Sequence, residues 1–85
     1  MSVLTNIRLI DRQQMGRLLQ EIYAGPDGRR VRFLASPQQA CSEVWSGTKW
    51  EAAYCLLEDF GDIPPEQVLT RLFKVTGDIL GWSTP

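Results

Sequence analysis

The sequence contains no histidine, and this absence excludes much chemistry. Histidine is the commonest general base near neutral pH and the commonest metal ligand. The two cysteines, Cys41 and Cys55, form no CxxC pair and so do not indicate a zinc site. We therefore expect no metal, no cofactor and no catalytic residue, and we expect that the chain is not an enzyme.

Long apolar runs are also missing. No stretch approaches the roughly 18 residues that a membrane-spanning helix needs, and the start of the chain lacks the basic-then-apolar pattern of a secretory signal. These absences predict a cytoplasmic protein without membrane contact. We expect reduced, buried cysteines in that compartment, although a disulfide between them stays open until their geometry is known.

Lysine is absent from residues 1–35, where all the positive charge comes from arginine. Six arginines and three acidic residues give this segment a charge of +3, whereas three basic and seven acidic residues give residues 36–85 a charge of −4. The guanidinium of arginine suits planar, bidentate and partly desolvated contacts better than a lysine ammonium does. The split predicts a basic surface in the first half, with ordinary surface charge as the alternative.

The chain of 85 residues is 44% hydrophobic, which suffices for one core but not for two. We therefore expect residues 1–85 to form a single small domain that is frayed at residues 1–4 and 83–85. Apolar residues recur at helical spacing in four segments. These predicted helices are 12–24, 37–46, 49–60 and 64–76, the last of which could extend to Leu80.

Start and stop signals support the last three of these helices. Ser36-Pro37 resembles a cap followed by a proline in the first turn, and Thr48 with Glu51 fits a capping box. Gly47 and Gly61 are the matching stops, and the prolines at 64 and 65 open the last helix.

Two segments, 3–10 and 29–35, alternate between apolar and polar residues and predict strands. The predicted fold class is therefore α+β and mostly helical, with three to four short helices packed on a small two-stranded β element. If the two strands pair across the first helix, their connection is a parallel crossover. One alternative makes Glu21–Ala24 a strand, joined by a Gly-Pro-Asp-Gly hairpin turn to 29–35. The helix is preferred because five apolar residues obey its period.

The candidate binding residues follow from the predicted strands and the end of the chain. Arg30 and Arg32 project to one strand face, and Arg8 joins them if the first strand pairs alongside. Trp82 is a candidate apolar anchor, with packing onto the helices as the alternative. The other large aromatic residues are expected in the core, among them Trp45 and Trp50.

These residues predict a small non-catalytic protein-binding module. It would act as an accessory, regulatory or inhibitory factor, in the manner of phage-encoded stoichiometric inhibitors, on a partner with an acidic surface. Two alternatives remain. The same arginines could bind nucleic acid, although the net charge of −1 disfavours this. An open strand edge or the tail with Trp82 could instead make a structural homo-oligomer, a homodimer being the simplest.

Overall fold

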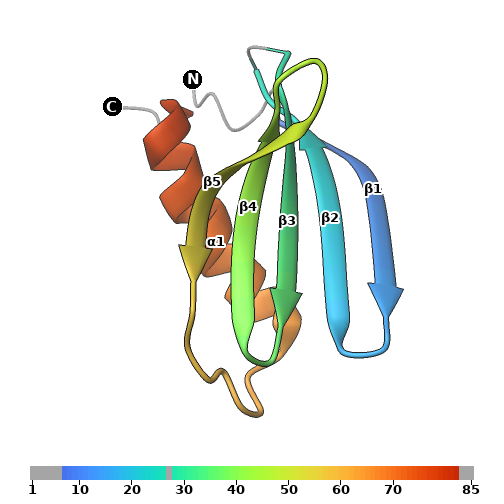
Figure 1. Cartoon of the computed structure of the whole chain (residues 1–85), viewed down its shortest axis with the longest axis vertical. Coiled ribbons are helices and arrows are strands. Elements are labelled where there is room, and N and C mark those ends of the chain that lie inside the picture. The colour runs from blue at the N-terminus through green and yellow to red at the C-terminus, as the bar shows by residue number, and fades with distance from the viewer. Residues whose placement is uncertain (1–6, 27, 83–85) are drawn as a thin grey trace.

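The computed structural model describes residues 7–26 and 28–82, which form an antiparallel five-stranded sheet with one helix packed across it (Figure 1). The elements are β1 (Arg8–Met15), β2 (Leu18–Ala24), β3 (Arg30–Ser36), β4 (Gln39–Trp45), β5 (Trp50–Leu56) and α1 (Pro65–Leu80). The strand order in the sheet is the chain order. The prediction of a mostly helical fold with three to four helices on two strands is therefore wrong.

Three short connections explain why predicted helices are hairpins. Gly16 and Arg17 join β1 to β2, and Gly16 has the positive φ of 62° that the first central position of a type II′ turn needs. This turn splits the helix predicted over 12–24. The alternative that placed Glu21–Ala24 in a strand is correct, since β2 pairs antiparallel with β3; residue 27 of the connecting turn lies outside the described residues.

The segment Ser36-Pro37 is a turn rather than a helix start. Ser36 and Gln39 are cross-strand partners, and Pro37 occupies the first central position, where its fixed φ is favourable. The Ser36 hydroxyl donates to the Gln39 carbonyl oxygen at 3.2 Å. The helix predicted over 37–46 is therefore β4.

The connection between β4 and β5 is a four-residue loop, Ser46–Lys49. The Ser46 N–H donates to the Lys49 carbonyl oxygen at 2.9 Å, and Gly47 adopts a positive φ of 104°. Ser46 Oγ accepts a bond from the Lys49 N–H at 3.2 Å. Thr48 therefore caps no helix, and most of the segment predicted as the helix 49–60 is β5.

The strand predicted over 29–35 is confirmed as β3, but its predicted partner is not. Residues 3–6 of the other predicted strand lie outside the described residues, while Arg8–Ile10 begin β1, which continues to Met15. β2 lies between β1 and β3, and all pairings are antiparallel, so the parallel crossover does not occur.

The predicted last helix is confirmed, including its extension to Leu80. Gly81 ends α1 in the left-handed conformation at φ 77°, and the Trp82 N–H donates to the Gly77 carbonyl oxygen at 2.7 Å. This backbone motif directs the chain back along the helix. Within the described residues, no helix has the length and apolar character that crossing a membrane requires.

The core lies between α1 and one face of the sheet. α1 packs across β3, β4 and β5 and meets β2 only marginally, so β1 extends beyond it (Figure 1). The buried core residues are Leu19, Val31, Phe33, Ala35, Ala40, Phe60, Val68, Leu69, Leu72 and Trp82. Inside this core the Thr76 hydroxyl donates to the Ser42 hydroxyl at 2.7 Å, and this hydrogen bond joins α1 to β4.

Candidate protein-binding face

In residues 7–26 and 28–82, one face of the sheet carries no helix. Val31, Phe33 and Ala35 of β3 are buried against α1, and alternate residues of a strand point to opposite faces. We call the side opposite α1 the outer face. The strand register places on it Arg8, Asp11, Gln13, Met15, Leu18, Gln20, Ile22, Ala24, Arg30, Arg32, Leu34, Gln39, Cys41, Glu43, Trp45, Trp50, Ala52 and Cys55.

Two of the predicted arginines meet across β2. Arg8 of β1 and Arg30 of β3 are both register partners of Ala24, so they flank this small residue from its two sides. Both arginines are exposed, and neither forms an ion pair with any residue that the structure describes. The sequence prediction placed Arg8 directly beside the β3 arginines, whereas β2 separates them.

The third arginine is held in place by its neighbours. Arg32 Nε donates to Glu43 Oε1 at 2.8 Å, and Nη2 bonds the same oxygen. The Arg32 guanidinium carbon also lies 4.6 Å from the centre of the Trp50 ring, which is cation–π geometry. Arg32 is therefore partly neutralised and fixed in one orientation, in contrast to Arg8 and Arg30.

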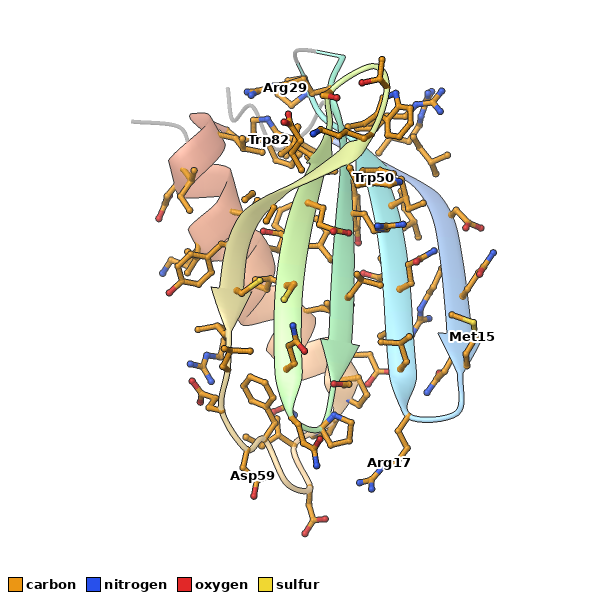
Figure 2. The ribbon with its side chains drawn as sticks, viewed as in Figure 1. Met15, Arg17, Arg29, Trp50, Asp59 and Trp82 are labelled. Carbon is orange, nitrogen blue, oxygen red and sulfur yellow. The ribbon has the colours of Figure 1, made fainter. Side chains whose placement is uncertain are left out.

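Two tryptophans complete this end of the outer face. Trp45 and Trp50 are cross-strand partners on either side of the β4–β5 loop, and their rings meet edge to face with centroids 5.4 Å apart. Figure 2 shows Trp50 at the end of the sheet close to that loop. We call Arg8, Arg30, Arg32, Trp45 and Trp50 the arginine–tryptophan cluster.

The expectation that Trp45 and Trp50 belong to the core is not met. Trp45 is 38% exposed and Trp50 is half-buried, and both lie on the face away from α1. A usable signal was present, since two tryptophans flank a four-residue loop that contains glycine. That spacing is typical of a cross-strand aromatic pair in a hairpin.

Trp82 does not lie on the outer face. It is 1% exposed, packs against Phe73 with ring centroids 6.1 Å apart, and approaches the backbone of Gly25 (Figure 2). The structure thus shows the packing alternative, in which the tryptophan closes the core. Trp82 is not available to a partner as an exposed anchor.

The centre of the outer face is mostly apolar. Leu34 of β3 is the partner of Cys41 in β4, which is the partner of Cys55 in β5. On β2, Ile22 and Leu18 lie on either side of Gln20, the partner of Leu34, and Leu18 pairs with Met15, which is 53% exposed (Figure 2). An apolar centre beside arginine and tryptophan side chains is the composition found at protein interfaces.

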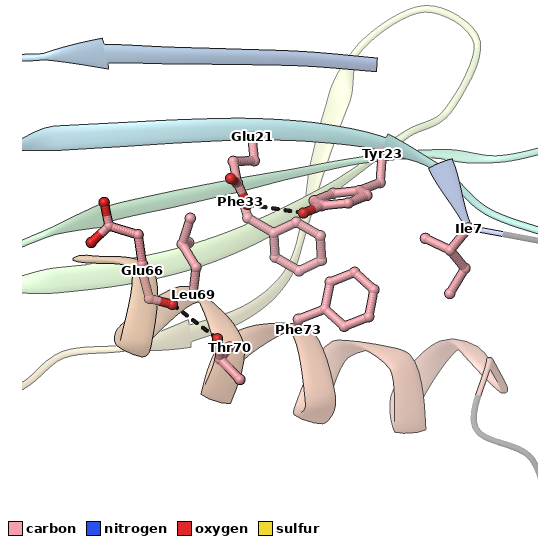
Figure 3. A pocket seen from close by; sticks show the side chains of 8 residues that line it. All are labelled: Ile7, Glu21, Tyr23, Phe33, Glu66, Leu69, Thr70 and Phe73. Carbon is pink, nitrogen blue, oxygen red and sulfur yellow. Dashed lines mark hydrogen bonds between the residues drawn. The ribbon is translucent and has the colours of Figure 1, made fainter. Parts of the chain in front are cut away.

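The opposite side of the molecule has a groove where α1 leaves β2 uncovered. Its volume is about 400 Å³, and it is lined by Ile7, Glu21, Tyr23, Phe33, Glu66, Leu69, Thr70 and Phe73 (Figure 3). The polar atoms at its rim bond one another.

The Tyr23 hydroxyl donates to Glu21 at 3.0 Å, and Arg12 bridges Glu21 and Glu66 with contacts of 3.2 Å each. Burial, followed by the hydrogen bond to Glu21, raises the pKa of Tyr23 to about 12. Because its polar groups are mutually satisfied, this groove offers a ligand little beyond apolar contact.

No protein-family model matches the chain, and no curated protein or solved structure is significantly similar to it.

Proposed function

We propose that this chain is a small, non-catalytic protein-binding module that contacts its partner through the outer face. The observation that carries the proposal is the arginine–tryptophan cluster beside a sheet surface with apolar side chains that no helix of the described residues covers. Tryptophan and arginine dominate the binding energy of many interfaces, and they do so beside apolar surface that becomes dry on binding. The sheet supplies a rigid support, so few side chains would lose freedom in the complex.

The partner should present an acidic patch. Arg8 and Arg30 carry positive charges that no described residue of this chain neutralises. Their spacing across Ala24 would let two carboxylates bind side by side. Arg32 would act differently, because Glu43 and Trp50 already hold its guanidinium as part of the surface that the partner meets. We also propose that the chain acts in the cytoplasm.

The test compares charge reversals at two places. The variant Arg8→Glu/Arg30→Glu changes the outer face, while Arg17→Glu/Lys74→Glu reverses two exposed charges outside that face, on the β1–β2 turn and on α1. Both variants change the net charge by the same amount. Each is tagged and used to capture partners from a native lysate treated with nuclease, with mass spectrometry as the readout.

The proposal expects a stoichiometric partner that wild type and the Arg17/Lys74 variant retain and the Arg8/Arg30 variant loses. Retention by all three proteins would contradict it. A second variant, Trp45→Ser, should lower the affinity for the same partner by roughly tenfold or more, as expected for an aromatic residue in an interface.

A nucleic-acid-binding function is the second candidate, and the exposure of Trp45 favours it. A base could stack on this indole beside the arginines. Under that alternative, capture would vanish with nuclease and oligonucleotide binding would fall steeply with salt. A homodimer is the third, favoured by the exposed edge strand β1, and it would give a melting temperature that rises with protein concentration.

A further inference from the structure

The two cysteines of the chain lie side by side on the outer face. Cys41 of β4 and Cys55 of β5 are direct register partners. Directly opposite residues of an antiparallel pair have Cα atoms about 4.5 or 5.5 Å apart, depending on the kind of pair. Both values fall within the range of about 4.4–6.8 Å that a disulfide spans. The backbone therefore already has the spacing that a cross-strand bridge requires.

As register partners on the outer face, the two cysteines carry neighbouring side chains. A hydrogen bond between the Cys55 and Cys41 side chains, with a smaller contribution from burial, raises the pKa of Cys55 to about 11. Gln39 Nε2 donates to Cys41 Sγ at 3.0 Å, which restrains this side chain. The sulfur atoms are thus neighbours before any reaction.

Their accessibility differs in a way that sets an order of reaction. Cys55 is exposed, whereas Cys41 is buried with 9% exposure. A dissolved disulfide reagent reaches Cys55 more readily than Cys41. Cys41 lies beside Cys55 and can displace the group that the reagent leaves on the Cys55 sulfur. An adduct on Cys55 would then be short-lived, because the second thiol is held next to it by the sheet.

We infer that Cys41 and Cys55 are a modification site, at which a low-molecular-weight disulfide converts the two thiols into a reversible intramolecular disulfide. The Cys55 thiolate attacks one sulfur of the reagent, forms a mixed disulfide and releases one thiolate, which takes up a proton. The Cys41 thiolate then attacks the Cys55 sulfur and releases the second thiol. The protein loses two electrons and two protons, and the reagent is reduced to two thiols.

This inference does not depend on the proposed protein-binding function, because the chemistry needs only the isolated chain. The test equilibrates the native protein in glutathione buffers of increasing oxidised fraction. Each sample is quenched with acid and alkylated, and its intact mass is measured. Wild type should pass from two alkylated thiols to none, as a monomer without a glutathione adduct. Accumulation of an adduct or of a cross-linked dimer in place of this species would overturn the inference.

Two controls make the result specific. Cys41→Ser should accumulate the glutathione adduct on Cys55, because the thiol that would displace it is gone. The wild-type titration is then repeated in denaturing urea. Because the fold holds the sulfurs together, the unfolded chain should need at least roughly ten times as much oxidant as the native protein. An equal requirement in both states would refute the inference, since the sheet would then contribute nothing to the bridge.

Discussion

Two glycines that lie next to Trp82 should respond in opposite directions to substitution by alanine. A Cβ atom added at Gly25 would lie 2.3 Å from Cζ2 and 2.7 Å from Cε2 of Trp82. The indole is 1% exposed, so other protein atoms surround nearly all of it. A Cβ atom added at Gly77 would lie 3.7 Å from the Cβ of Trp82, which is ordinary van der Waals contact. Gly77 is also inside α1, where alanine is the better helix former.

The sizes of the two effects follow from these contacts. Overpacking of a filled core costs about 1–3 kcal/mol, whereas glycine in a helix interior costs roughly 0.5–1 kcal/mol relative to alanine. A chain of this length has a free energy of unfolding of about 4–13 kcal/mol in total. At about 4–8 °C per kcal/mol, Gly25→Ala should lower the melting temperature by roughly 5–20 °C, and Gly77→Ala should raise it by a few degrees.

Urea unfolding measured by circular dichroism and by tryptophan fluorescence separates these outcomes. Both variants should keep the wild-type m-value, and only their midpoints should move, in opposite directions. In a Trp82→Leu background, which removes the ring atoms that the added Cβ meets, the cost of Gly25→Ala should shrink. If Gly25→Ala unfolds at the wild-type urea concentration, the close packing of Trp82 on Gly25 is refuted.

Three further predictions concern buried or paired groups. Tyr23 should ionise only near pH 12 in the folded protein. The raised pKa of Tyr23 therefore contributes to the free energy of unfolding in full below pH 10, and this contribution is lost between pH 10 and 12. Ultraviolet titration of wild type and Tyr23→Phe measures the ionisation, and a transition near pH 10 would contradict the prediction. The rate of Cys55 alkylation should rise with pH up to about pH 11. Cys41→Ala removes the side chain that raises the pKa of Cys55, so this variant should react faster than wild type at pH 8. An unchanged rate in Cys41→Ala would argue against an interaction between the two sulfur atoms. Thr76→Val should lower the free energy of unfolding in urea by about 1–2 kcal/mol, because it removes the buried hydrogen bond to Ser42. A double-mutant cycle with Ser42→Ala should show that the two effects are not additive, and strict additivity would refute the hydrogen bond.

The parts of the fold that the sequence predicts correctly are those with one buried face. α1 keeps Val68, Leu69, Leu72 and Thr76 on a single stripe, and its prolines and Gly81 mark its limits. β3 alternates buried Val31, Phe33 and Ala35 with outward residues. In both elements the charged residues fall on the solvent side, so the period can be read from the sequence alone.

β4 and β5 could not be predicted in this way, because both of their faces carry apolar side chains. Ala40 and Val44 face α1, while Cys41 and Trp45, which follow them directly, occupy the outer face. Adjacent apolar pairs three to four residues apart imitate the stripe of a helix. The wrong helix prediction and the proposed function thus have one physical cause, which is the apolar side chains on the side of the sheet that no described helix covers.

The candidate site could be predicted only in part for the same reason. The arginines could be proposed from charge alone, and the structure brings Arg8 and Arg30 to either side of Ala24. The contribution of Trp45 and Trp50 could not be foreseen while β4 and β5 were taken for helices. Trp82 was a candidate because of its place in the sequence, but the turn at Gly81 directs it into the core.

The agreement between strand order and chain order has a consequence for synthesis on the ribosome. Each strand can pair with the preceding one as soon as it emerges, because every partner is already present. α1 follows all five strands in the chain, so the growing sheet exposes two apolar faces until Leu69, Leu72 and finally Trp82 have emerged. The nascent chain therefore passes through a stage at which it is most prone to association with chaperones or with other nascent chains, and that stage ends only when the helix docks.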